Sequence, residues 1–237
     1  MTFSPPVRSI EEIYNDLCRK RDAYRFGQFP EQEEAFFAEK KNMEWLVLGA
    51  AQVCLRKAGL SYPKFAAAGE IVGPESPDFF TYSDIDGAGE QKVEITQVLK
   101  PGYKQKMEHK ASAIRNRYPV KPVFFELDRP LLRPFEGVRE SISKKARKQY
   151  ASSSTLIIYY NVANSDRTYD PNLSFSDHML SEHSTSVFEE TDKFKRLMVL
   201  SADFQQLIEL HPTARLIAGE TKKSRVLLDN LKTTDSK

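Results

Sequence analysis

An uninterrupted apolar run, TLIIYYNV at residues 155–162, constrains the fold more than any other feature of this chain. A strand with one face in water would alternate apolar and polar residues, so this run predicts a central strand that is covered on both faces. The preceding segment, 138–150, repeats apolar residues every four positions, which is the period of a helix packed along one side. A helix that leads into a buried strand favours an α/β fold with helices flanking the sheet.

A second segment, ESPDFFTYSDIDGAGEQKVEITQ at residues 75–97, predicts two strands joined by a turn, with one acid on each strand. Asp78 follows Pro77 in the first strand, and Glu94 lies in the alternating run 93–96 of the second. The intervening loop is rich in Asp and Gly, so we expect a hairpin that brings the two carboxylates together. Paired carboxylates suit a hard divalent cation such as Mg²⁺ or Mn²⁺, and they indicate a metal-dependent phosphodiesterase centre.

This pattern resembles the PD-(D/E)xK nuclease superfamily, in which a Pro-Asp is followed, across a turn, by an acid, one spacer residue and a lysine. The resemblance covers about residues 31–161 and implies a restriction-endonuclease-like core of order α-β-β-β-α-β, with a mixed central sheet flanked by helices. It also implies a Mg²⁺-dependent endonuclease that hydrolyses DNA phosphodiester bonds, with Asp78 and Glu94 as metal ligands and catalytic residues.

The chain departs from this pattern at the position of the lysine, where it has Thr96. In the helix predicted for residues 138–150, Lys145 lies near the edge of the apolar stripe, so it could reach the two carboxylates from the helix. We therefore expect Lys145 to replace the lysine of the strand, with Lys148 as the second choice. The competing interpretation is a solvated basic helix face.

Further candidates are weaker. Glu44, in a predicted long helix, and Glu70, in a predicted first strand, could be additional ligands, although helical glutamates are usually solvated. Thr96 shares the face of Glu94 and could hold a water through its hydroxyl group. The four histidines show no metal-ligand spacing, and we interpret them as surface residues.

The expected elements follow the chain in a simple order. Before the hairpin we expect a helix at Ile10–Arg25 capped by Ser9, a helix at 31–57 ended by Gly59, and a strand at 64–72. After it we expect a basic helix at 104–118 and an edge strand at 123–127. Residues 165–186 predict a loop with one short helical turn, followed by strands at 197–200 and 216–218 around a helix at 201–210. The expected division is an N-terminal helical extension (1–30), a nuclease-like core (31–162) and a C-terminal α/β extension packed on the core (163–237).

Basic residues cluster on two of the predicted helices that flank the acidic pair in sequence. Lys104 and Lys110 represent the first cluster, and Lys144 and Lys148 the second. Lysines so placed would contact phosphates and give salt-dependent, largely sequence-independent affinity, so we expect nucleic acid, DNA before RNA, as the partner. The net charge of +2 requires that any such surface come from local clustering.

Composition excludes some classes of protein. No apolar run is long enough for a membrane helix and the start lacks a signal-peptide pattern, so we expect a cytoplasmic protein without a membrane partner. The two cysteines lack metal-binding spacing. Two alternatives to an enzyme stay open: an inactive nuclease-like protein that binds nucleic acid or a protein, and a structural or regulatory partner in phage defence or a mobile element. The oligomeric state is open, and a homodimer is among its options.

Overall fold

The computed structural model describes residues 6–26, 39–69, 76–86, 88–99, 134–148, 151–161, 175–184 and 190–219. The expected helix at 104–118, the edge strand at 123–127 and the candidate residues Glu70, Lys104 and Lys110 lie outside these ranges. Within them, no helix is both long enough and apolar enough to cross a membrane.

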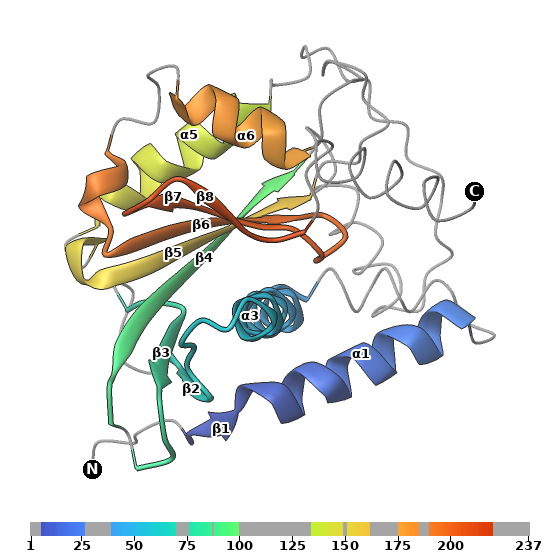
Figure 1. The fold of residues 1–237 in the computed structure, drawn as a ribbon. Helices are drawn as coiled ribbons and strands as arrows, with labels where there is room; N and C mark the ends of the chain where they lie inside the picture. The colour runs from blue at the N-terminus through green and yellow to red at the C-terminus, as the bar shows by residue number, and fades with distance from the viewer. Residues whose placement is uncertain are drawn as a thin grey trace, which may run out of the picture.

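Eight strands form one mixed sheet whose order in space follows their order in the chain (Figure 1). The strands are β1 (Arg8–Ser9), β2 (Phe65–Ala68), β3 (Phe79–Tyr82), β4 (Gln91–Leu99), β5 (Ser154–Asn161), β6 (Arg196–Ser201), β7 (Leu207–His211) and β8 (Arg215–Ala218). The pairs β4–β5 and β5–β6 are parallel, and all other neighbours are antiparallel. Strands from each of the three expected segments of the chain therefore belong to this single sheet.

Helices cover both faces of the sheet, as the apolar run of β5 requires (Figure 1). The helices are α1 (Ile10–Phe26), α3 (Lys40–Lys57), α5 (Pro134–Ala146) and α6 (Phe175–Ser184), with short 3₁₀ turns η2 (Ala151–Ser153) and η3 (Thr191–Lys193). Helices α1 and α3 pack on one face around a core that contains Trp45 and Phe79. Helices α5 and α6 pack on the other face, around Ile142 and Met179. Connections between parallel strands are almost always right-handed. The connections from β4 to β5 and from β5 to β6 advance in the same direction across the sheet, so their helices α5 and α6 lie on the same face.

Several local predictions are confirmed. The backbone N–H of Glu12 donates to Ser9 Oγ at 3.3 Å, so Ser9 caps α1 as its spacing predicts. Gly59, with a φ of +67°, follows the end of α3. Strand β4 has the predicted bounds and β5 differs by one residue at each end. From α3 to β5 the described elements follow the order helix, three strands, helix, strand.

Two predictions for the C-terminal part are wrong. Residues 165–186 contain the ten-residue helix α6. Its sequence is largely polar, so the apolar face formed by Phe175, Met179 and Leu180 was not evident from the sequence. Residues 201–210, predicted as a helix, instead form a turn and most of β7. Asp203 accepts a hydrogen bond from the Gln205 N–H at 3.1 Å, which favours the turn over a helix.

Candidate functional site

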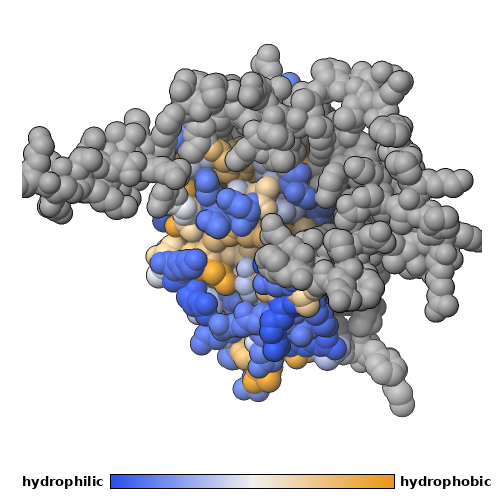
Figure 2. Space-filling view, turned by 90° about the vertical axis from the view of Figure 1, so that its right-hand side faces the viewer, coloured by the Kyte–Doolittle hydropathy of each residue, from blue (hydrophilic) through white to orange (hydrophobic). Residues whose placement is uncertain are grey.

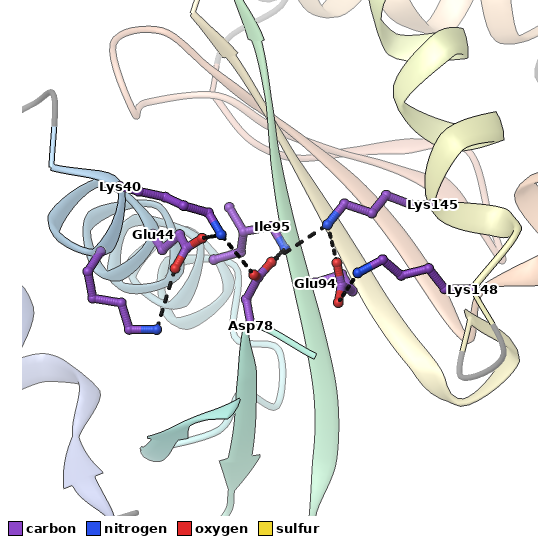
Figure 3. Close-up of polar contacts among 8 residues, drawn as sticks. Lys40, Glu44, Asp78, Glu94, Ile95, Lys145 and Lys148 are labelled. Carbon is purple, nitrogen blue, oxygen red and sulfur yellow. Dashed lines mark hydrogen bonds and ion pairs between the residues drawn. The ribbon is translucent and has the colours of Figure 1, made fainter. Parts of the chain in front are cut away.

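The hairpin of β3 and β4 brings the two predicted carboxylates together. Phe79 pairs with Val93, so extending the antiparallel register by one residue places Asp78 opposite Glu94. Asp78 Oδ2 accepts a hydrogen bond from the backbone N–H of Ile95 at 2.8 Å. This bond fixes the Asp78 carboxylate against β4, next to the residue that carries the second acid (Figure 3).

A glycine at the end of β2 sets the position of Asp78. The N–H of Gly69 donates to the Asp78 carbonyl oxygen at 3.0 Å. A Cβ atom on Gly69 would lie 1.7 Å from the carbonyl oxygen of Pro77, so no other residue fits here without moving the backbone. The close approach of two backbone segments therefore holds the start of β3 in place.

Glu94 points from β4 toward α5 and is 1% exposed. Strand alternation puts it on the face of Val98, which belongs to the core beneath α5. Helix α5 lies close to this face because Gly137 packs against Val98, where a Cβ would come within 2.5 Å of a methyl group. A buried carboxylate needs a compensating partner, and the nearby helix supplies it.

The partners of Glu94 are two lysines at the end of α5 (Figure 3). Lys145 Nζ contacts Glu94 Oε2 directly and lies 3.9 Å from Asp78 Oδ2, so one ammonium group bridges the two acids. Lys148, just beyond the helix, places its Nζ 3.7 Å from Glu94 Oε1. Lys145 thus reaches the carboxylates from the helix, as its position near the apolar stripe predicts.

A third carboxylate, Glu44 of α3, lies on the other side of Asp78 (Figure 3). Its side chain is 3% exposed, with Lys40 Nζ 3.0 Å from Oε1 and Lys41 Nζ 3.5 Å from Oε2. Neither of its oxygens accepts a well-formed hydrogen bond from the part of the chain that the structure describes. Burial raises the pKa of Glu44, the Asp78 carboxylate raises it further, and Lys40 and Lys41 oppose both effects.

Asp78 links the two groups, because Lys40 Nζ also lies 3.7 Å from its Oδ1. The result is an alternating row of ammonium and carboxylate groups contributed by α3, the β3–β4 hairpin and the end of α5. In spatial order the row is Lys41, Glu44, Lys40, Asp78, Lys145, Glu94 and Lys148. Each glutamate contacts two lysines, and Asp78 contacts one lysine from each side.

The donor chemistry of this row fits a divalent cation in part. Asp78 and Glu94 supply hard carboxylate oxygens, and Mg²⁺ commonly uses only one or two protein carboxylates together with waters and phosphate. Glu44 adds buried oxygens that accept no well-formed hydrogen bond within the described residues. No group of three or more acidic, histidine or cysteine side chains in the described ranges is arranged as a metal cage. The residues therefore suit an ion that keeps most of its waters.

The other candidates are dispersed. Thr96 is half-buried on the face of Glu94, and Lys144 is exposed on α5. The sequence interpretation missed Lys40 and Lys41. Their spacing from Glu44, four and three residues along one helix, is the signal that could have found them.

The described surface offers little for a hydrophobic partner. In the view of Figure 2, hydrophilic residues dominate the lower part of the described surface. Among the residues that the structure describes, Ile85 at the tip of the β3–β4 hairpin is the only large hydrophobic side chain that is exposed, at 64%. A single exposed apolar side chain does not make a docking patch.

No protein-family model, curated protein sequence or solved structure matches this chain.

Proposed function

We propose that this protein is a divalent-metal-dependent nuclease that hydrolyses DNA phosphodiester bonds. The observation that carries the proposal is the position of the Lys145 ammonium group between the carboxylates of Asp78 and Glu94. Two acids and a lysine converge here from a hairpin and a separate helix. The lysine that the sequence pattern lacks at Thr96 is thus supplied, on this proposal, by α5.

The residues divide the chemical work as follows. Asp78 and Glu94 would hold Mg²⁺ or Mn²⁺, which supplies a water of lowered pKa and neutralises charge on the phosphate. Lys145 donates hydrogen bonds to a phosphate oxygen and offsets the charge that develops there. The backbone N–H of Ile95 orients the Asp78 carboxylate, and Lys148 remains as a counter-ion for buried Glu94.

The order of elements in the fold supports the proposal. The order of elements from α3 to β5 agrees with the α-β-β-β-α-β core that the sequence pattern suggests. Asp78 immediately precedes the second strand of that unit, Glu94 lies on the third, and Lys145 lies at the end of the helix that follows. We therefore propose a restriction-endonuclease-like core extended by β6, β7 and β8.

A second candidate function is an inactive nuclease-like protein that binds nucleic acid. One observation favours it: both oxygens of Glu94 already contact lysine ammonium groups. Four lysines compensate three carboxylates across the row, so every carboxylate has a cationic partner without an added ion. A binder needs nothing more than the exposed lysines around such a row.

A cleavage assay separates the two candidates. Purified protein is incubated with supercoiled plasmid, linear duplex, single-stranded DNA and RNA, each with Mg²⁺, Mn²⁺ or a chelator. We expect metal-dependent cutting of DNA by the wild type and loss of most cutting in Lys145→Ala. Metal binding should survive in that variant, because the lysine acts on phosphate rather than on the ion.

The control is Lys20→Ala, which removes an exposed lysine of α1 and should cut like the wild type. If the wild type cuts none of the four substrates under any metal but still binds DNA, the nuclease proposal fails and the binding function replaces it. Loss of metal binding in Lys145→Ala would point to disruption of the site rather than to a role on phosphate.

A further inference from the structure

The two lysines that contact Asp78 differ sharply in their surroundings. Lys145 is 15% exposed and is enclosed between α5 and the sheet. Lys40, on the opposite side of Asp78, is 75% exposed at the first turn of α3. Both place an ammonium group between two carboxylates, but Lys40 can move its ammonium group into water by rotating its side chain.

Glu44 and Asp78, the two carboxylates that contact Lys40, need a positive charge nearby even when the Lys40 side chain moves away. Glu44 is buried, its oxygens accept no well-formed hydrogen bond within the described residues, and Asp78 is close enough to raise its pKa. Neighbouring carboxylates repel each other unless positive charge lies between them. In this structure that charge comes from Lys40, together with Lys41, which contacts Oε2 of Glu44.

Lys41 provides an internal contrast. Its Nζ lies 4.8 Å from the centre of the Phe79 ring, it is 28% exposed, and it contacts Oε2 of Glu44, whereas Lys40 contacts Oε1. The ring and the partial burial hold this ammonium group in place. A divalent cation held by Asp78 and Glu94 would neutralise the Asp78 partner of Lys40 and repel its exposed ammonium group, whereas Lys41 would stay on Glu44.

We infer that Lys40 is an exchangeable internal counter-ion: it positions Glu44 against Asp78 in the cation-free protein and is displaced into solvent when a divalent cation binds Asp78 and Glu94. This inference rests on the metal dependence in the proposed function. It assigns Lys40 a positioning role in the cation-free state. It also couples loading of the site to the release of a positive charge at its rim.

The first test measures competition for the carboxylates. Mn²⁺ is titrated calorimetrically into the wild type, Lys40→Ala, Lys40→Arg and the control Lys20→Ala. Exposed ion pairs are weak, so removal of the competing ammonium group should tighten Mn²⁺ binding by about two- to fivefold in Lys40→Ala. Lys40→Arg, which keeps the charge, and Lys20→Ala should bind like the wild type. Weaker or unchanged binding in Lys40→Ala overturns the inference.

The second test uses the wild type and needs no variant. Lysine acetylation by an amine-reactive ester is followed residue by residue by mass spectrometry, with and without saturating Mn²⁺. Released from its two carboxylates, Lys40 should react with the ester about two- to fivefold faster when Mn²⁺ is bound, because ion pairing no longer restricts the position of its amine. Lys41 should react at the same rate in both states. Equal rates for Lys40 with and without bound Mn²⁺ overturn the exchange.

These outcomes separate the inference from the nuclease proposal. Faster labelling of Lys40 with Mn²⁺ but no cleavage of any substrate supports the exchange and removes the nuclease activity. Cleavage of DNA without a change in the labelling of Lys40 supports the nuclease activity and overturns the exchange. A wild type that binds no Mn²⁺ overturns the exchange and the metal-dependent mechanism together, whereas the binding function would survive.

Discussion

The carboxylate of Asp78 accepts a hydrogen bond from the backbone N–H of Ile95, with 2.8 Å between Oδ2 and N. The bond crosses from the residue before β3 to the residue after Glu94, and it leaves Oδ1 turned toward Lys40. The orientation of the central acid is therefore set by the sheet, while its charge is compensated by lysines from two helices.

This relationship predicts different effects for two substitutions of Asp78. Asp78→Ala removes the acceptor for a buried N–H and should lower the free energy of unfolding by about 1–3 kcal/mol. Asp78→Asn retains an oxygen acceptor and should lose less stability, yet both variants should lose Mn²⁺ binding because the negative charge is gone. Urea denaturation and calorimetric titration measure the two effects separately.

The matched control for this prediction is Asp86→Asn, an exposed acid of the same hairpin. It should change neither the free energy of unfolding nor the affinity for Mn²⁺. Wild-type affinity for Mn²⁺ in Asp78→Asn would remove Asp78 from the set of ligands.

Two glycines place the acids, and their substitution should have different consequences. In Gly69→Ala the new methyl group meets the backbone oxygen of Pro77, which cannot rotate away. We expect a loss of about 1–3 kcal/mol or more, measured by denaturation, together with weaker Mn²⁺ binding as Asp78 shifts. Gly137→Ala meets a methyl group of Val98 instead, which a second substitution, Val98→Ala, can remove.

The second glycine therefore offers a rescue experiment. The double variant Gly137→Ala with Val98→Ala should recover the separation of α5 from β4 and with it the contact of Lys145 with Glu94. Its cleavage activity and thermal stability should exceed those of Gly137→Ala alone. Additive losses in the double variant would show that the close approach of α5 to β4 does not matter for the site.

Much of the site could be predicted because its signals are local. The alternating and continuous apolar runs define β4 and β5, and the four-residue period of α5 places Lys145 at the edge of its buried face. Glu44 and Lys40 were harder to predict. A glutamate four residues from a lysine on a helix usually indicates a solvated ion pair, but this glutamate is buried because α3 packs against the sheet, where Trp45 contacts Phe79.

The errors in the C-terminal part have the same origin. The four residues 207–210 are all buried, so their sequence lacks the alternation that would separate a strand from a buried helix. Asp203 and the positive φ of Phe204 make the turn that starts β7, and neither could be inferred from period alone. Tertiary pairing with β6 and β8 decided the outcome.

The two cysteines should differ in reactivity. Burial raises the pKa of the Cys54 thiol, with Asp203 adding to the effect and Lys57 opposing it. Less thiolate is then present at pH 8, and the side chain is only 3% exposed, so Cys54 should react with iodoacetamide much more slowly than half-buried Cys18. Mass spectrometry of timed samples at pH 7, 8 and 9 measures both rates. Equal rates at pH 8 would show that α3 opens readily.

The last prediction tests whether the end of α5 contacts phosphate. Lys144 and Arg147 are exposed beside the row of charges and have no assigned part in holding Glu94. Each phosphate contact adds about 0.9 to the slope of log affinity against log salt concentration, so Lys144→Ala with Arg147→Ala should reduce that slope by about 2 on a random duplex. The control is Arg19→Ala with Lys20→Ala on α1, which removes the same charge from residues that pair with Asp16. Fluorescence anisotropy between 50 and 200 mM salt gives both slopes. If the two variants lose the same amount, net charge alone governs binding and α5 carries no specific phosphate contact.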